Sequence, residues 1–272
     1  GGWRNRPMGG GLKFRIPISL LNMVSNAWVV NATTNTEALQ RLWGMGRLRT
    51  YVVPNGLDFR DKDYTVADPL GEEMQSWVNG RMVVGAVGTI SRQKNFDLFF
   101  DVAKRLSHLA SKVCFCLVGG AETSSHDLER HLRNRIEREE LSAYVRMMGN
   151  SANVAGLLPH FSVMLCTSDF EGCPNVVMEA MRARLAVVMT DCCDTDLLVE
   201  ENESGHVVPV GDLEALVCRT AELLDDPEKC RRFGLRARQL AEKHFQATES
   251  AWLMARIYLK EWGRRQRISR GR

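Results

Sequence analysis

The sequence predicts an α/β fold that is doubly wound around a parallel sheet. Short runs rich in β-branched residues alternate with amphipathic stretches from residue 82 onward, which is the pattern of buried strands and covering helices. Glycines and polar residues gather where the predicted strands end, at the edge where such sheets bind ligands. A hydrophobic content of 44% in 272 residues is ample for a buried core. Together these observations define the fold class.

The predicted elements follow one another in a regular order. "MVVGAVG" at 82–88 indicates a buried strand, and "VCFCLVGG" at 113–120 indicates a second one that ends in glycines. A charged helix is predicted over 125–139. The later strands are predicted at "VRMMG", "VMLCTS", "LAVVMT" and "HVVPVGD". The helix between the first two strands is predicted from apolar residues at helical spacing, namely Phe96, Phe99, Phe100, Ala103 and Leu106.

The two ends of the chain differ from this regular body. The first 80 residues contain only a strand, helix, strand fragment, in "NAWVVNATTNTEALQRL" and "RTYVVPNG", which is too little to bury a core of its own. The last helix carries an apolar stripe that we expect to pack against another part of the protein: Trp252, Ile257, Tyr258 and Trp262.

The net charge of +3 is concentrated at the C-terminal end, where residues 260–272 hold six basic side chains and one acidic one. The rest of the chain is close to neutral, so we expect no nucleic-acid partner. The basic tail suits a peripheral contact with anionic lipid, and the alternative is a solvated end. Residues 1–14 lack the apolar segment of a signal peptide, so we expect a cytoplasmic protein, with any membrane contact at the inner face.

The eight cysteines show neither zinc-ligand spacing nor the pattern of a disulfide framework. Most of them lie in apolar runs and are interpreted as small core residues in a reducing compartment. The acidic triplet at Asp194–Asp196 is similar to a metal-binding motif, but its position after a strand favours a helix cap. We therefore predict no metal site.

The stretch "FEGCPNVVMEAM" places Glu171 and Glu179 eight positions apart. Pro174 suits the start of a helix, and Gly172 allows the backbone to approach a ligand closely. The first amides of this helix, around 175–177, favour a bound phosphate, while the two carboxylates can accept hydrogen bonds from hydroxyl groups. A sugar nucleotide offers both kinds of group. The alternative is that both glutamates are ordinary solvated charges.

"SDFEGCPNVVMEAM" resembles the E-x7-E region of the retaining glycosyltransferases of family 4, which have the GT-B fold. "VGTISRQKNFDLFFDVAKRL", "LVGG", "VVMTD" and "GHVVPVGDLEAL" continue the resemblance in family order over residues 82–225. The resemblance implies a Rossmann-like domain that binds a nucleoside-diphosphate sugar without a metal ion or other cofactor, and a transfer that retains the anomeric configuration.

The resemblance also implies roles for individual residues. Glu171 would hold hydroxyls of the donor sugar, Glu179 would hold the ribose hydroxyls, and Lys94 would stabilise the leaving diphosphate. The backbone that contacts the donor would come from Gly88, Thr89, Gly172, Cys173, Pro174, Asn175 and Val176.

The sequence departs from the family pattern at two of these positions. Thr89 stands where the family commonly has an arginine, five residues before the lysine, and Arg92 is the candidate to replace it. Cys173 stands where an aromatic residue is frequent. The first departure bears on catalysis and not on the fold.

We therefore predict an enzyme that transfers a hexose-type sugar to a hydroxyl of a carbohydrate or lipid-linked acceptor, and the alternative is a sugar-nucleotide-binding module without catalysis. Three parts are expected: a remnant of the acceptor-side domain with its linker (1–80), the donor-binding domain (81–246), and a C-terminal helix with a basic tail (247–272).

Overall fold

The computed structural model of the chain describes residues 25, 27–33, 36, 49–59, 71–122 and 125–270. The chain divides into two compact units, one of Gly1–Asp58 with Phe245–Arg272 and one of Phe59–His244. The helix predicted within "NATTNTEALQRL" lies largely outside the described residues. The three-part division of the chain stays a prediction.

The unit Phe59–His244 is built on a six-stranded sheet in which all neighbouring strands are parallel. The strand order is β5-β4-β3-β6-β7-β8, so the chain winds outward in opposite directions from the central β3 and β6. The predicted doubly wound α/β fold is thereby confirmed. The strands are β3 (Met82–Val87), β4 (Val113–Val118), β5 (Val145–Gly149), β6 (Val163–Cys166), β7 (Ala186–Thr190) and β8 (Gly205–Val208).

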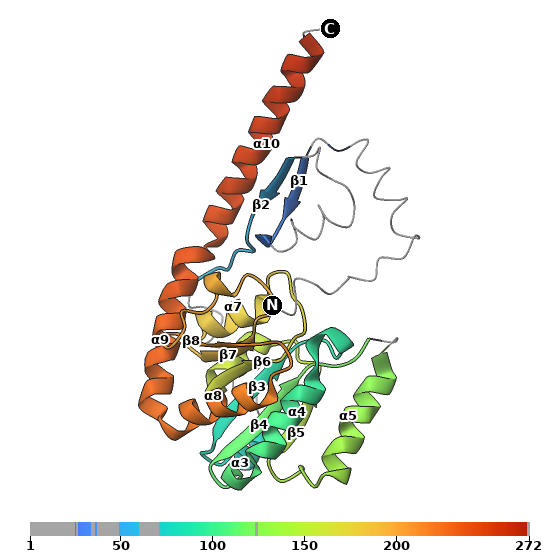
Figure 1. Cartoon of the computed structure of the whole chain (residues 1–272), viewed down its shortest axis with the longest axis vertical. Helices are drawn as coiled ribbons and strands as arrows, with labels where there is room; N and C mark the ends of the chain where they lie inside the picture. Colours follow the sequence, from blue (N-terminus) through green and yellow to red (C-terminus); the bar gives the residue numbers. More distant parts are fainter. Residues whose placement is uncertain are drawn as a thin grey trace. The chain divides into compact units, whose positions relative to one another are not determined.

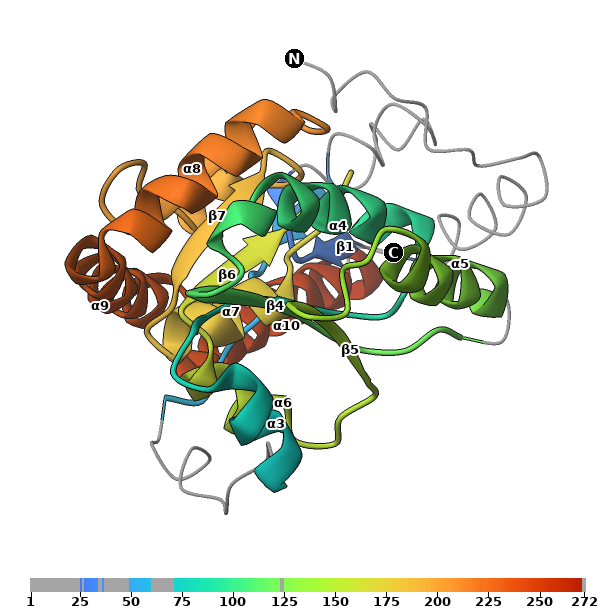
Figure 2. The ribbon, with the colours of Figure 1, turned by 90° about the horizontal axis from the view of Figure 1, so that it is seen from below.

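Helices cover both faces of this sheet. Figure 2 shows α4 and α8 on one face and α6 and α7 on the opposite one. Helix α3 precedes β3 and was missing from the predicted elements. The helices of this unit are α3 (Gly71–Val78), α4 (Phe96–Arg105), α5 (His126–Arg138), α6 (Val154–Leu157), α7 (Asn175–Arg182), α8 (Leu213–Asp225) and α9 (Pro227–His244).

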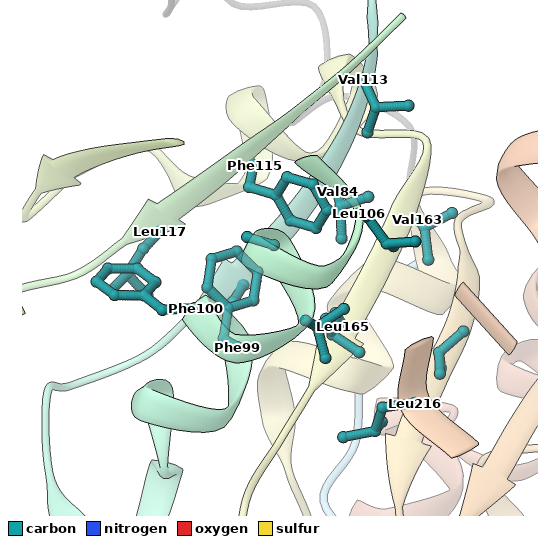
Figure 3. Packing of buried hydrophobic residues seen from close by; sticks show 14 of the residues in the cluster. Val84, Phe99, Phe100, Leu106, Val113, Phe115, Leu117, Val163, Leu165 and Leu216 are labelled. Atoms are coloured by element: carbon teal, nitrogen blue, oxygen red, sulfur yellow. The ribbon is translucent and has the colours of Figure 1, made fainter. Parts of the chain in front are cut away.

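The core lies mainly between α4 and the sheet (Figure 3). Phe99 and Phe100 of α4 are completely buried, and the Phe99 ring meets the ring of Phe115 on β4 edge to face, with centroids 5.8 Å apart. All five residues that predicted this helix are buried. The helix that follows β3 is therefore fixed by its apolar face, and the loop between them is held at both ends.

The second unit contains the parallel strands β1 (Ala27–Val30) and β2 (Arg49–Val52) and the helix α10 (Ala247–Arg270). Figure 1 shows α10 running beside β2. Glu261 of α10 accepts hydrogen bonds from Arg49 Nη2 at 2.8 Å and from Tyr51 Oη at 2.7 Å, which joins the helix to β2. No helix among the described residues is both long and apolar enough to cross a bilayer.

The predicted packing of the apolar stripe on α10 is wrong for three of its four residues. Ile257 is buried, whereas Trp252, Tyr258 and Trp262 are 69%, 70% and 63% exposed. The reason is geometric: at about 100° per residue, Trp252 and Trp262 lie on the side of the helix away from Ile257, and Tyr258 lies on its flank. One face of α10 packs, and the opposite face is aromatic and exposed.

Candidate functional site

The loop that follows β6 is tied to the loop that follows β7. The Thr190 hydroxyl donates to the Ser168 carbonyl at 2.5 Å, and the Glu171 amide donates to the Cys192 carbonyl at 2.7 Å. Ser168 and Thr190 are buried, and Glu171 is only 9% exposed. The backbone that carries Glu171 is therefore held in place at the carboxyl edge of the sheet.

The carboxylate of Glu171 accepts hydrogen bonds from three side chains. Lys94 Nζ lies 2.6 Å from Oε1, and Ser168 Oγ donates to the same oxygen at 2.8 Å. Gln93 Nε2 donates to Oε2 at 3.2 Å. A partly buried carboxylate with three donors, one of them charged, is well satisfied.

Lys94 reaches Glu171 because the loop after β3 folds onto the loop after β6. Lys94 ends a short 3₁₀ turn (Arg92–Lys94), and Asn95 after it has the left-handed backbone φ of 48°. Asn95 Nδ2 donates to Asp169 Oδ1 at 2.9 Å, and the Thr167 hydroxyl donates to the Lys94 carbonyl at 3.0 Å. The two loops thus form one structure at the centre of the sheet edge.

The side chain of Lys94 is mostly enclosed, with 18% of it exposed. Burial acts to lower the pKa of Lys94, but the charge of Glu171 and the hydrogen bond to it outweigh burial, so the pKa is raised overall. A Cβ atom on Gly88 would come within 3.0 Å of the Lys94 Cε, and Gly88 has a φ of 153°. Glycine at this position leaves room for the lysine stem along the backbone.

Helix α7 begins at Asn175, as predicted, with Pro174 at the N-cap position. The Val177 and Met178 amides both donate to the Pro174 carbonyl, at 3.0 and 3.3 Å. Val177 is therefore not among the amides that a ligand could bind, contrary to the predicted span of 175–177. The amides before it lie at the positive end of the helix.

Glu179 lies in the second turn of α7 and is half-buried. Burial raises the pKa of this carboxyl, and the positive charge of Arg182 opposes the shift only partly. Among the described residues, no side chain donates a hydrogen bond to it. A carboxylate that is buried without a donor is costly, and such groups concentrate at functional sites.

The other predicted site residues lie at the same edge but differ in their surroundings. Thr89 and Arg92 are exposed, and Arg92 stays outside the Glu171 hydrogen bonds. The Cys173 thiol is partly exposed and lies 3.6 Å from the Met178 sulfur. Gly172 and Val176 are half-buried in the loop and in the first turn of α7, and Asn175 is exposed.

These residues meet at the topological switch point of the sheet, where neighbouring β3 and β6 lead to helices on opposite faces. Open α/β sheets bind ligands at this point. The arrangement offers an enclosed cation, a tethered carboxylate, a second carboxylate that receives no side-chain hydrogen bond within the described part of the chain, and the N-terminal end of a helix. Sequence reasoning found the charged residues and missed Gln93 and Ser168, which hold Glu171.

Comparison with known proteins agrees with this fold. The family model described as Glycosyl transferases group 1 matches residues 72–240. The chain is 24% identical to the alpha-maltose-1-phosphate synthase of Mycolicibacterium smegmatis, over 95% of this chain and 69% of that protein. It is 26% identical to the lipopolysaccharide core biosynthesis mannosyltransferase LpsB of Rhizobium meliloti, over 64% of this chain and 50% of that protein.

Solved structures share the fold. The Anabaena protein Alr3699/HepE in complex with UDP has a TM-score of 0.76 and 23% identity, over 90% of this chain and 67% of that one. Staphylococcus aureus TarM, in a complex that includes UDP, has a TM-score of 0.73 and 17% identity, over 92% of this chain and 45% of that one. The chain thus spans from under half to about two thirds of the lengths of these relatives.

Proposed function

The chain belongs to the Glycosyl transferases group 1 family, and from this premise we propose that it transfers a hexose-type sugar from a nucleoside diphosphate to an acceptor hydroxyl with retention, as in family 4. The observation that carries the proposal is the enclosed Lys94–Glu171 pair at the switch point, which joins the loop before α4 to the loop before α7. A UDP complex of a structural neighbour supports a nucleotide ligand for this fold.

Each charged group has a task in this reaction. Glu171 accepts hydrogen bonds from hydroxyls of the donor sugar, and Glu179 accepts them from the ribose, whose hydroxyls supply the donors that Glu179 lacks among the described residues. Lys94 and the first amides of α7 stabilise the diphosphate as negative charge develops on it. The backbone from Gly172 to Val176 and at Gly88 and Thr89 lines the diphosphate and sugar.

The transfer step breaks the bond between the anomeric carbon and the diphosphate oxygen and forms a bond to the acceptor oxygen. With retention, the acceptor arrives on the face from which the diphosphate leaves, and the acceptor proton passes to the departing phosphate oxygen. We propose that no metal ion takes part, because Lys94 supplies a preorganised cation. Arg92 is exposed enough to swing toward the phosphates as a second cation.

A second candidate is a module that binds the sugar nucleotide without catalysis. It is favoured by Thr89, which stands where a second cation is common. The acceptor is a carbohydrate or a lipid-linked saccharide on this proposal, and the similarity to a lipopolysaccharide core mannosyltransferase supports a glycolipid.

We also propose a peripheral contact of α10 with the anionic inner face of a membrane. Its exposed residues combine large apolar side chains with cations, and its one acid in the second half, Glu261, is paired with Arg49 and Arg264. Such a face suits an anionic interface. The protein should co-sediment with vesicles that contain phosphatidylglycerol and should not co-sediment with vesicles of phosphatidylcholine alone. A dimer that covers the exposed face of α10 would prevent sedimentation with either kind of vesicle. The exposed residues are Trp252, Arg256, Tyr258, Leu259, Lys260, Trp262, Arg265 and Arg267.

Calorimetric titration with UDP, GDP and ADP in excess EDTA tests the donor site. We expect one nucleotide to bind, with the same Kd when Mg²⁺ replaces EDTA, and we expect Glu179→Ala to weaken it about tenfold, the effect of one good charged hydrogen bond. Glu203→Ala, at an exposed loop carboxylate, is the matched control and should change nothing. A folded chain that binds none of the three contradicts the proposal. Where a donor is turned over, the anomeric proton coupling of the product reports retention.

A further inference from the structure

We infer that the carboxylate of Glu171 makes the site bind the intact sugar donor in preference to the nucleoside diphosphate that remains after transfer. The inference rests on the proposed function and concerns the same site. It assigns Glu171 a second task, which is discrimination between substrate and product.

The first step is that Glu171 cannot move out of the way of a bound phosphate. Its carboxylate is held by Ser168 Oγ at 2.8 Å and by Gln93 Nε2 at 3.2 Å, and its amide donates to the Cys192 carbonyl at 2.7 Å. Ser168 is itself fixed, because it is 1% exposed and its carbonyl accepts from Thr190. The negative charge therefore stays where it is when a ligand arrives.

The second step is that the ammonium group of Lys94 and the carboxylate of Glu171 are in direct contact. Lys94 Nζ lies 2.6 Å from Glu171 Oε1, so any phosphate that binds the ammonium also comes within a few Å of the carboxylate. Two like charges at such a distance repel strongly in an enclosed site, because the effective dielectric constant there is far below that of water. The attraction of Lys94 for a phosphate is thus partly cancelled.

The third step compares the two ligands. In the donor, the terminal phosphate is esterified by the sugar, and the sugar hydroxyls donate hydrogen bonds to Glu171, which offset its negative charge. In the released nucleoside diphosphate, these donors are missing and the terminal phosphate carries additional negative charge near pH 7, since its second pKa is about 6. The product therefore meets a carboxylate that no sugar hydroxyl contacts, and it brings more negative charge than the substrate does.

The consequence is a site that loses affinity for its own product once the sugar has left. Product release limits the rate of many transferases and other enzymes, so an arrangement that weakens product binding supports turnover. Glu179 does not share this property, because it lies in the second turn of α7, where no hydrogen bond or ion pair of the described residues joins it to Lys94. On the proposed function it also serves a ribose that both ligands contain.

The test compares Kd values for one nucleotide sugar and its nucleoside diphosphate in the wild type and in Glu171→Gln, which removes the charge and keeps the shape. We expect the nucleoside diphosphate to bind about tenfold more tightly to the variant, from the Coulomb estimate at intermediate dielectric. The donor should bind no more tightly than to the wild type. Glu203→Gln is the control for a general change of charge, and both Kd values should stay unchanged in it.

Glu171→Ala provides a second comparison of the two Kd values in case the glutamine variant does not fold. Circular dichroism shows whether each variant is folded. If the nucleoside diphosphate binds to the folded variants no more tightly than to the wild type, the inference is overturned, while the proposed donor site is unaffected. Equal gains for both ligands overturn it as well. A wild-type chain that binds neither ligand overturns both the inference and the proposed function.

Discussion

At the scale of single residues, the chemistry of the candidate site depends on one ion pair. Lys94 has a raised pKa because Glu171 is beside it, and Glu171 is nine-tenths enclosed and receives its only charged hydrogen bond among the described residues from Lys94. Buried ion pairs contribute modestly when intact, but removing one partner leaves an uncompensated charge. Stability and ligand binding are therefore linked at this pair.

Lys94→Met should destabilise the fold and abolish the attraction for a diphosphate. We expect a loss of about 3 kcal/mol in the free energy of unfolding, because the Glu171 carboxylate is left enclosed with neutral donors only. The double variant Lys94→Met with Glu171→Gln should recover most of this stability, but its nucleotide affinity should stay below that of the wild type because the ammonium group is missing. Urea denaturation measures the first quantity and calorimetry the second. A single variant as stable as the wild type would argue against the enclosed pair.

Glu179→Gln should stabilise the ligand-free protein. Burial raises the pKa of Glu179 above the ordinary value of 4.5, so its charged form costs native stability at neutral pH, and this cost vanishes as the pH falls and the carboxyl is protonated in both states. We expect the free energy of unfolding to rise by about 1 kcal/mol at pH 8, the size of gain that is common when a costly functional residue is replaced. The gain should shrink toward pH 4.5. A gain that does not change with pH would show another origin.

At the scale of elements, α5 is attached to α4 through one buried guanidinium. Arg135 of α5 donates to Asp97 at 2.9 Å, to Asp101 at 2.7 Å and to Glu139 at 2.9 Å. This arrangement lowers the pKa of Glu139 to about 2, chiefly through its hydrogen bond with Arg135. The covering helix between β4 and β5 is thus held by charge as well as by apolar contact.

Arg135→Met should cost about 3 kcal/mol at pH 7, because three acidic side chains lose their shared partner. A lowered pKa stabilises the native state above the ordinary value of 4.5, and this contribution is lost as the pH falls toward 2, so the difference from the wild type should shrink by pH 3. Arg138→Met is the matched control: Arg138 is exposed and also contacts Glu139, and its loss should cost below about 0.5 kcal/mol. Equal costs for the two variants would contradict the special position of Arg135.

Much of the fold could be predicted at this scale because buried parallel strands are nearly continuous apolar runs and α4 has a complete apolar face. Helix α7 could be placed because Pro174 marks its start. Helix α3 was missed because "GEEMQSWV" has a short apolar face that a loop could equally have. The aromatic residues of α10 do not predict which side of the helix packs, because that side is set by the angle of each residue around the helix axis.

The candidate site was predicted only in part, for a physical reason. Glu171 and Glu179 are recognisable from residue type and from their positions around the start of a helix, whereas Lys94 is identified by the family resemblance. The role of Gln93 depends on how two loops, more than 70 residues apart in sequence, meet after β3 and β6. The role of Ser168 depends on how the loop after β6 folds back on itself. Neither a glutamine beside a lysine nor a serine three residues before a glutamate carries a signal of that contact.

At the scale of the whole molecule, all the site residues belong to one of the two units, Phe59–His244. On the proposed function, the donor is bound by the parallel-sheet unit through its own loops. This chain covers 69% and 50% of the lengths of the two curated relatives described above. The acceptor and its contacts are therefore part of the proposal and not of the observed fold.

Hydrogen–deuterium exchange, measured with and without the nucleotide that binds, tests most directly whether the donor site lies at the β3 and β6 edge. We predict slower exchange in the segments 88–95 and 170–178 on nucleotide binding, with no change in α5 or α10. Protection confined to other segments, with 88–95 and 170–178 unchanged in a chain that demonstrably binds the nucleotide, would contradict the central claim.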